Sequence, residues 1–160
     1  CDDTDGGVHP DSVDGCDGVD EDCDGDVDED AVDEDPYEPN DSSAFDLGSL
    51  QDDGDHSIDA ALHTDDDVDR FAFSFEDGTF SFFALDVGLS NIPDDATYQL
   101  RVENLSTGEL YFDEVGSGSL STSIGDTLLH EDGGDWEITV SSAGGADCGQ
   151  RYLLTVGFSE

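Results

Sequence analysis

Residues 20–29 place acidic side chains at the spacing of a calcium-binding loop. Asp20, Asp22 and Asp24 occupy alternate positions, and Gly25 follows them directly. An EF-hand loop begins with carboxylates at positions 1, 3 and 5 and a glycine at position 6, which permits a sharp turn around the ion. We therefore expect these three aspartates to bind Ca²⁺.

The second half of this loop is expected to supply the remaining ligands. The carbonyl oxygen of Asp26 would face the ion, and Asp28 or Glu29 would complete the shell. An EF-hand has glutamate at position 12, whereas Ala31 stands there in this chain, and no flanking helices are apparent. The motif is therefore a shortened loop rather than an EF-hand. The alternative is a chance pattern in an aspartate-rich segment.

A second group of aspartates lies further upstream with less regular spacing. Asp3 and Asp5, with Asp14 or Asp17 folding back, are candidates for another ion. A solvated acidic tail is the alternative interpretation.

The whole chain is strongly acidic. Its 160 residues include 44 acidic and three basic side chains, giving a net charge of -41. Such a chain repels polyphosphates and anionic membranes, which excludes nucleic-acid binding and docking through a basic patch. We find no membrane-spanning apolar run and no signal segment, so we expect a soluble mature chain or an excised piece.

Two explanations for the acidic residues compete. A salt-adapted protein spreads Asp and Glu over its surface, whereas a calcium protein concentrates Asp in loops. Here 33 Asp stand against 11 Glu, and they cluster in residues 1–35 and 52–69. The clustering favours calcium, and salt adaptation stays open as an additional property.

The four cysteines favour two disulfides and an extracytoplasmic setting. Cys16 and Cys23 do not have the C-x2-C spacing of a zinc site. Of three connectivities we favour Cys16–Cys23 together with Cys1–Cys148. Alternatively, Cys1 has lost an upstream partner or is a lipid-modified N-terminus.

From about residue 58 onward the chain alternates apolar and polar residues, as β-strands do. Residues 1–35 lack any periodicity, and residues 36–49 contain two prolines and are expected to form a turn-rich junction. Eight or nine short strands are expected. The fold class predicted is all-β: an antiparallel, jelly-roll-like β-sandwich with an irregular N-terminal module that calcium and disulfides order.

The first aromatic strand carries phenylalanines from Phe71 to Phe75 on its core-facing side. We place Asp69 on the opposite, polar side. The apolar phase changes between Phe82 and Phe83, which predicts a β-bulge.

Residues 1–31, with Cys1, Cys16 and Cys23 among repeated Asp and Gly, resemble the Asp/Cys-rich metal-binding repeat of bacterial secreted proteins, the MopE type. The match covers one full repeat, although an upstream cysteine usual for such repeats would fall before residue 1. The resemblance also suggests that copper could be bound through histidine and an oxidised tryptophan. Trp136 is the one tryptophan, and its place in the strand alternation predicts that it faces the core, which argues against this role.

Residues 36–158 resemble the bacterial pre-peptidase C-terminal domain, a sandwich akin to the collagen-binding domain of bacterial collagenases. The resemblance rests on residues 38–41, 66–71, 134–136 and 151–156. It implies a calcium ion that attaches the N-terminal linker to the sandwich. The ligands that it implies are Glu38, Asn40, Asp41, Asp66 and Asp69, with Asp67 as an alternate.

Catalysis finds little support in the sequence. There is no Gly-x-Ser-x-Gly elbow, and no two histidines have a metal-ligand spacing. Each histidine is interpreted as an ordinary surface residue: His9, His56, His63 and His130.

We expect a calcium-binding module over residues 1–35 and a β-sandwich over residues 36–160. The function predicted is that of a secreted or cell-surface, non-catalytic structural or adhesive module that binds two or more calcium ions. The alternatives are a subunit of a calcium-dependent extracellular fibre or layer, and a targeting appendage of a secreted hydrolase. Expected partners are calcium and either further copies of the chain or another extracellular protein or polysaccharide.

Overall fold

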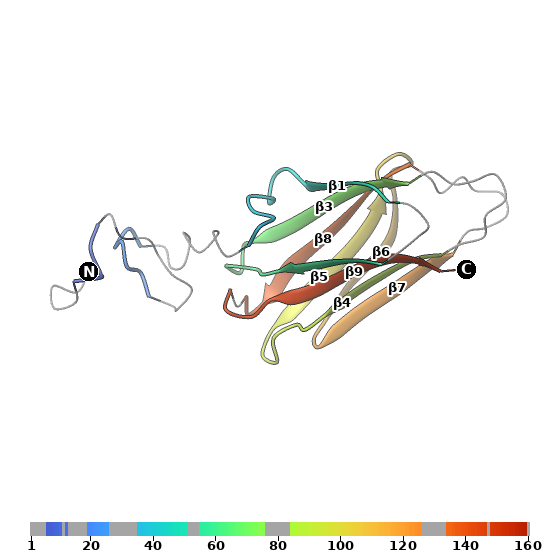
Figure 1. The fold of residues 1–160 in the computed structure, drawn as a ribbon. Helices are drawn as coiled ribbons and strands as arrows, with labels where there is room; N and C mark the ends of the chain where they lie inside the picture. Colours follow the sequence, from blue (N-terminus) through green and yellow to red (C-terminus); the bar gives the residue numbers. More distant parts are fainter. Residues whose placement is uncertain are drawn as a thin grey trace.

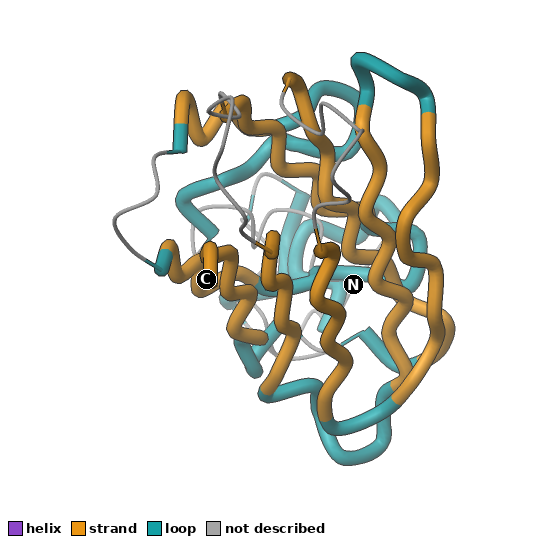
Figure 2. Tube along the Cα trace, turned by 90° about the vertical axis from the view of Figure 1, so that its right-hand side faces the viewer, coloured by secondary structure: helices purple, strands orange, loops and turns teal. Residues whose placement is uncertain are grey.

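Nine strands and no helix are found among the residues that the computed structural model describes (Figure 2). The described residues are 6–10, 12, 19–25, 35–50, 55–75, 84–125, 134–146 and 148–159. The strands are β1 (Phe45–Ser49), β2 (His56–Ala60), β3 (Val68–Phe75), β4 (Ala84–Ser90), β5 (Thr97–Asn104), β6 (Glu109–Gly116), β7 (Ser119–Gly125), β8 (Gly134–Gly144) and β9 (Tyr152–Ser159).

The strands form two sheets that pack face to face (Figure 1). The order is β1-β3-β8-β5-β6 in the five-stranded sheet and β2-β9-β4-β7 in the four-stranded sheet. Neighbouring strands are antiparallel except β1 and β3, which run parallel. This exception arises because β2, which lies between them in sequence, belongs to the other sheet. The predicted all-β sandwich is confirmed.

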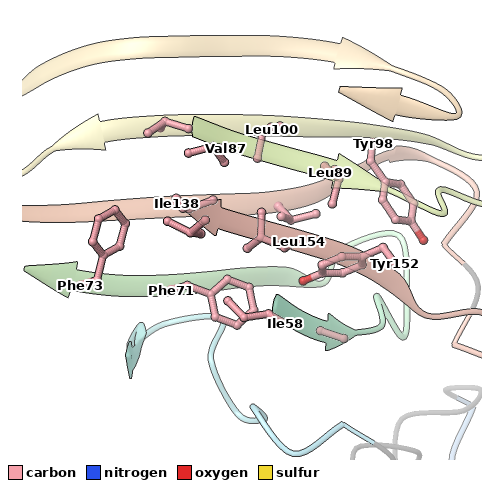
Figure 3. Close-up of a cluster of buried hydrophobic side chains, with 14 of the residues drawn as sticks. Ile58, Phe71, Phe73, Val87, Leu89, Tyr98, Leu100, Ile138, Tyr152 and Leu154 are labelled. Atoms are coloured by element: carbon pink, nitrogen blue, oxygen red, sulfur yellow. The ribbon is translucent and has the colours of Figure 1, made fainter. Parts of the chain in front are cut away.

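The core fills the space between the sheets. Along β3, buried and half-buried residues alternate without interruption, as expected for a strand with one face inside. Figure 3 shows Phe71, Phe73 and Ile138 of the five-stranded sheet near Val87 and Leu154 of the four-stranded sheet. Trp136 is fully buried on β8, as its phase predicts.

One local prediction needs correction, and another lies outside the described residues. The segment expected to be a turn-rich junction contains β1 at its C-terminal end, after both prolines. Phe82 and Phe83, where we predicted a β-bulge, lie outside the described residues, so the bulge stays a prediction.

Cys23 and Cys148 are each disulfide-bonded. Our predicted pairing also involves Cys1 and Cys16, which lie outside the described residues, so the connectivity stays a prediction. The same holds for the division of the chain into modules at residue 35.

Two leucines on neighbouring strands test the position of the core. Leu100 on β5 is fully buried, whereas Leu110 on β6 is 47% exposed. We expect Leu100→Ala to lower the free energy of unfolding by about 2–5 kcal/mol, through lost burial and the cavity left behind. Leu110→Ala should cost below about 1 kcal/mol. Urea unfolding of both variants measures the difference, and equal losses would contradict the assignment of the core.

Candidate metal centre

Residues 35–41, which we call the linker segment, lie against the N-terminal end of β3 and the chain before it (Figure 1). The carboxylate of Asp35 is buried and accepts two backbone hydrogen bonds. One comes from the N–H of Ala61 at 2.7 Å and the other from the N–H of Tyr37 at 2.9 Å. The segment is thereby attached to the residue that follows β2.

Asn40 and Asp41 attach the same segment to β3. Oδ1 of Asn40 accepts a hydrogen bond from the backbone N–H of Arg70 at 3.2 Å. Oδ1 of Asp41 accepts one from the N–H of Val68 at 3.1 Å, and its carbonyl oxygen accepts another from Nε of Arg70 at 2.8 Å. Asn40 is fully buried. Side-chain hydrogen bonds thus attach the linker segment to β3, as backbone hydrogen bonds between strands attach β1 further along the sheet.

Asp69 occupies a core-facing position, which corrects our expectation of a polar-side residue. It shares the parity of Phe71 and Phe73 along β3 and has no exposed surface. Its Oδ2 accepts a hydrogen bond from the hydroxyl of Tyr152 on β9, whereas its Oδ1 is buried without a partner. Burial raises the pKa of Asp69 to about 8, and the charge of Asp67 adds to the rise. Burial and the Asp69 charge also raise the pKa of Tyr152.

His63 is buried, and the prediction of a surface residue is wrong for it. Its side chain is 6% exposed, and Nδ1 lies 3.3 Å from Oδ2 of Asp67. The same carboxylate oxygen accepts the backbone N–H of His63 at 2.6 Å. The hydrogen bond to Asp67 raises the pKa of His63 against the opposing effect of burial. Burial alone would raise the pKa of Asp67, but the bonds from His63 lower it.

Glu38 lies between these two buried groups. Its Oε2 accepts the backbone N–H of Asn40 at 2.9 Å, and its Oε1 is buried without a partner. Its pKa is raised, mainly by burial and further by the charge of Asp67. A carboxylate of this segment therefore faces carboxylates from both the β2–β3 connection and β3.

These side chains form what we call the β3 cluster: Glu38, Asn40, His63, Asp67 and Asp69. A ring nitrogen of His63 and one carboxylate oxygen each of Glu38 and Asp67 lie within 4.8 Å of one another. Four buried polar atoms of the cluster have no hydrogen-bond partner. They are Oε1 of Glu38, Nδ2 of Asn40, Nε2 of His63 and Oδ1 of Asp69.

Such a concentration of unsatisfied polar groups is expensive in a protein interior. Buried polar atoms are nearly always hydrogen-bonded, and a buried carboxylate requires a partner of opposite charge. Arg70, the nearest arginine in sequence, binds Glu137 through its Nη1 at 2.9 Å. A divalent cation would satisfy the oxygens and balance the charge, so the residues present fit a metal ion.

Not every ligand that the resemblance implies is in the cluster. Asp66 is exposed, whereas Asp67, the alternate, is buried within it. Asp41 lies at its edge, where burial and the neighbouring Asp67 raise its pKa. The ligand oxygen expected of Asn40 accepts the Arg70 N–H. His63 was not predicted as a ligand, because it has no metal-ligand spacing to another histidine in the sequence.

The N-terminal loop also brings its three aspartates together. Carboxylate oxygens of Asp20, Asp22 and Asp24 lie within 4.8 Å of one another. Backbone N–H groups donate to two of them, from Cys23 to Asp20 at 2.6 Å and from Asp24 to Asp22 at 2.9 Å. We call residues 20–25 the aspartate loop. The other predicted ligands of this region lie outside the described residues: Asp3, Asp5, Asp26, Asp28 and Glu29.

The buried carboxyl of Asp69 predicts a pH dependence of the metal-free protein. Its pKa is about 8 in the folded state against an ordinary value of 3.8, so the folded state holds the proton more tightly. The stability that this group contributes is complete below its ordinary pKa and is lost as the pH rises to about 8. We expect urea unfolding in EDTA to show this loss, and Asp69→Asn to reduce it.

Asp94→Asn, at an exposed turn, is the matched control and should keep the wild-type pH profile. Glu38 and Asp41 act in the same direction as Asp69, while Asp65 and Asp67, whose pKa values are lowered, act in the opposite one. The test is therefore the difference between the pH profiles of the variants and the wild type, and not the steepness of the wild-type profile by itself. Identical profiles for wild type and Asp69→Asn would contradict the prediction.

No family model matches the sequence, and no curated protein matches it. No described helix is long and apolar enough to cross a membrane. Among solved structures, the chain is similar to the pre-peptidase C-terminal domain of collagenase from Bacillus anthracis. The two are 12% identical, with a TM-score of 0.48 over 75% of this chain and 100% of that one. The neighbour has the domain type that we expected for residues 36–158, and the resemblance of residues 1–31 to the MopE-type repeat stays a prediction.

Proposed function

We propose that this protein is a secreted, non-catalytic structural module in which divalent cations attach an acidic N-terminal segment to a β-sandwich. The observation that carries the proposal is the β3 cluster, where four residues have a buried polar atom without a partner. The cluster joins the linker segment to β3 and to the chain before it. A cation bound there would hold the linker segment in a fixed position against the sandwich.

The role of the ion is then structural. The unfolded chain does not bring these side chains together, so the free energy of binding adds to the free energy of folding. Without the ion, burial disfavours the charged forms of Glu38 and Asp69 and raises their pKa values, and the charge of Asp67 adds to both rises. The same linkage makes the attachment of the linker segment dependent on the ion concentration outside the cell.

For the aspartate loop we propose Ca²⁺. Its three ligands are carboxylates, which are hard oxygen donors of the kind that calcium selects. This loop and the β3 cluster together would account for at least two ions. In biological terms the protein would be an adhesive or spacing module at the cell surface.

Thermal unfolding in EDTA and in millimolar divalent cation tests this function. At a cation concentration of about 100 Kd the ion should stabilise the fold by about 2.7 kcal/mol, a rise in Tm of about 5–10 °C. Asp67→Asn should remove most of the rise that arises from the β3 cluster. Asp24→Asn should reduce Ca²⁺ binding at the aspartate loop, and Asp94→Asn should change neither.

Unfolding in EDTA with high sodium chloride is the control for salt adaptation. A monovalent salt screens carboxylates in general but does not satisfy a specific site. An equal rise in Tm with sodium chloride would refute the proposed sites and favour generic salt adaptation.

Assembly into a fibre or layer is a second candidate that one observation favours. The edge strand β6 exposes Leu110 and Val115, which are 47% and 55% exposed, and an apolar edge invites another strand. We expect Val115→Lys to abolish any calcium-dependent assembly. Size-exclusion chromatography in Ca²⁺ and in EDTA measures this, and a monomer under both conditions would eliminate the assembly role.

A further inference from the structure

We propose that His63 is a nitrogen ligand of the ion in the β3 cluster, and that this site therefore takes a first-row transition-metal ion such as Zn²⁺ in preference to Ca²⁺. The inference rests on the proposed function, since it identifies the ion at that site. It departs from the calcium that the family resemblance implies, because no imidazole is among the implied ligands.

The hydrogen bonding of His63 leaves one ring nitrogen for a metal. Nδ1 lies 3.3 Å from Oδ2 of Asp67, at which distance an Nδ1–H donates to the carboxylate. Nε2 then presents a lone pair, and it is buried without a partner. Metal-ligating histidines in general donate their other ring N–H to a carboxylate or carbonyl, which fixes the tautomer and orients the ring. His63 and Asp67 have this arrangement.

A histidine that only fills space in a core does not require these surroundings. The ring of His63 lies among acidic groups, with Glu38 and Asp67 both near enough to share an ion with it. No described group donates a hydrogen bond to Nε2. A buried imidazole beside two carboxylates is well placed to bind a cation and poorly placed for apolar packing.

Few buried side-chain oxygens of the cluster are without a partner, compared with the number in a calcium shell. Ca²⁺ takes about six to eight oxygen ligands. The buried oxygens without a partner are Oε1 of Glu38 and Oδ1 of Asp69. The side-chain oxygens of Asn40 and Asp41 that contact β3 already accept backbone N–H groups.

One nitrogen and two or three carboxylates match the small, mixed ligand sets of zinc and its neighbours in the periodic table. The aspartate loop offers only oxygen at its described positions and provides an internal contrast. We therefore assign different ions to the two sites.

The first experiment uses the full chain with the metal ions themselves as probes. Protein freed of metal with EDTA and then desalted is titrated with ZnCl₂ in the presence and absence of excess CaCl₂, and the histidine rings are observed by two-bond ¹H–¹⁵N NMR. Zn²⁺ should shift the Nε2 resonance of one buried ring at about one equivalent, and excess Ca²⁺ should not reverse the shift. Reversal by Ca²⁺, or a shift at exposed rings alone, would overturn the inference.

The second experiment compares His63→Gln with His56→Gln, a substitution of the exposed histidine on β2. His63→Gln should remove the shifted ring resonance and weaken Zn²⁺ binding tenfold or more, while the Ca²⁺ affinity of the chain stays within about twofold. His56→Gln should change neither. Equal losses of Zn²⁺ and Ca²⁺ binding would mean that His63 only supports the fold.

Failure of this inference can be told from failure of the proposed function. If Ca²⁺ raises the Tm of wild type and His63→Gln equally and Zn²⁺ has no advantage, the site is a calcium site and only the inference fails. If neither ion raises the Tm, the proposed function fails with it. Should His63→Gln not fold, the ring spectrum of the wild-type protein decides alone.

Discussion

A carboxylate in a core-facing position is the constraint on which this end of the sandwich depends. Asp69 follows the same alternation as the phenylalanines of β3, and so it points between the sheets. A charge there must be hydrogen-bonded, protonated or balanced. Tyr152 from the opposite sheet supplies one hydrogen bond, and Asn40 and Glu38 from the linker segment lie next to it. The path of the linker segment is thus arranged around one buried acid.

The β3 cluster connects three parts of the chain. It contains residues of the linker segment, of the connection between β2 and β3, and of β3 itself, and through Tyr152 it reaches β9. The apolar core begins directly beside it, with Phe71 on β3 and with the ring of Tyr37 against that of Phe71 at 5.6 Å. A change of ion or protonation in the cluster therefore acts on both sheets and on the entry of the chain.

Much of the fold could be predicted from the sequence because alternation is a local signal. Phe71, Phe73 and Trp136 face the core as their phase predicts. The parallel pairing of β1 with β3 could not, since it depends on β2 crossing to the other sheet. For the site, Glu38 and Asp67 were among the candidates, but His63 was not, because a single histidine has no spacing to recognise. What identifies it is burial beside Asp67, which only the fold produces.

The parallel pairing of β1 with β3 has a mechanical consequence. A pulling force applied on the N-terminal side of residue 35 would first meet the side-chain contacts of the linker segment with Ala61, Val68 and Arg70. Beyond them, a pull along β1 would load its hydrogen bonds to β3 together, in shear, instead of peeling them apart singly. Strands loaded in shear yield at higher force than strands that unzip. A pull from the N-terminal side would therefore be met first by the side-chain contacts of the linker segment and then by the pairing of β1 with β3.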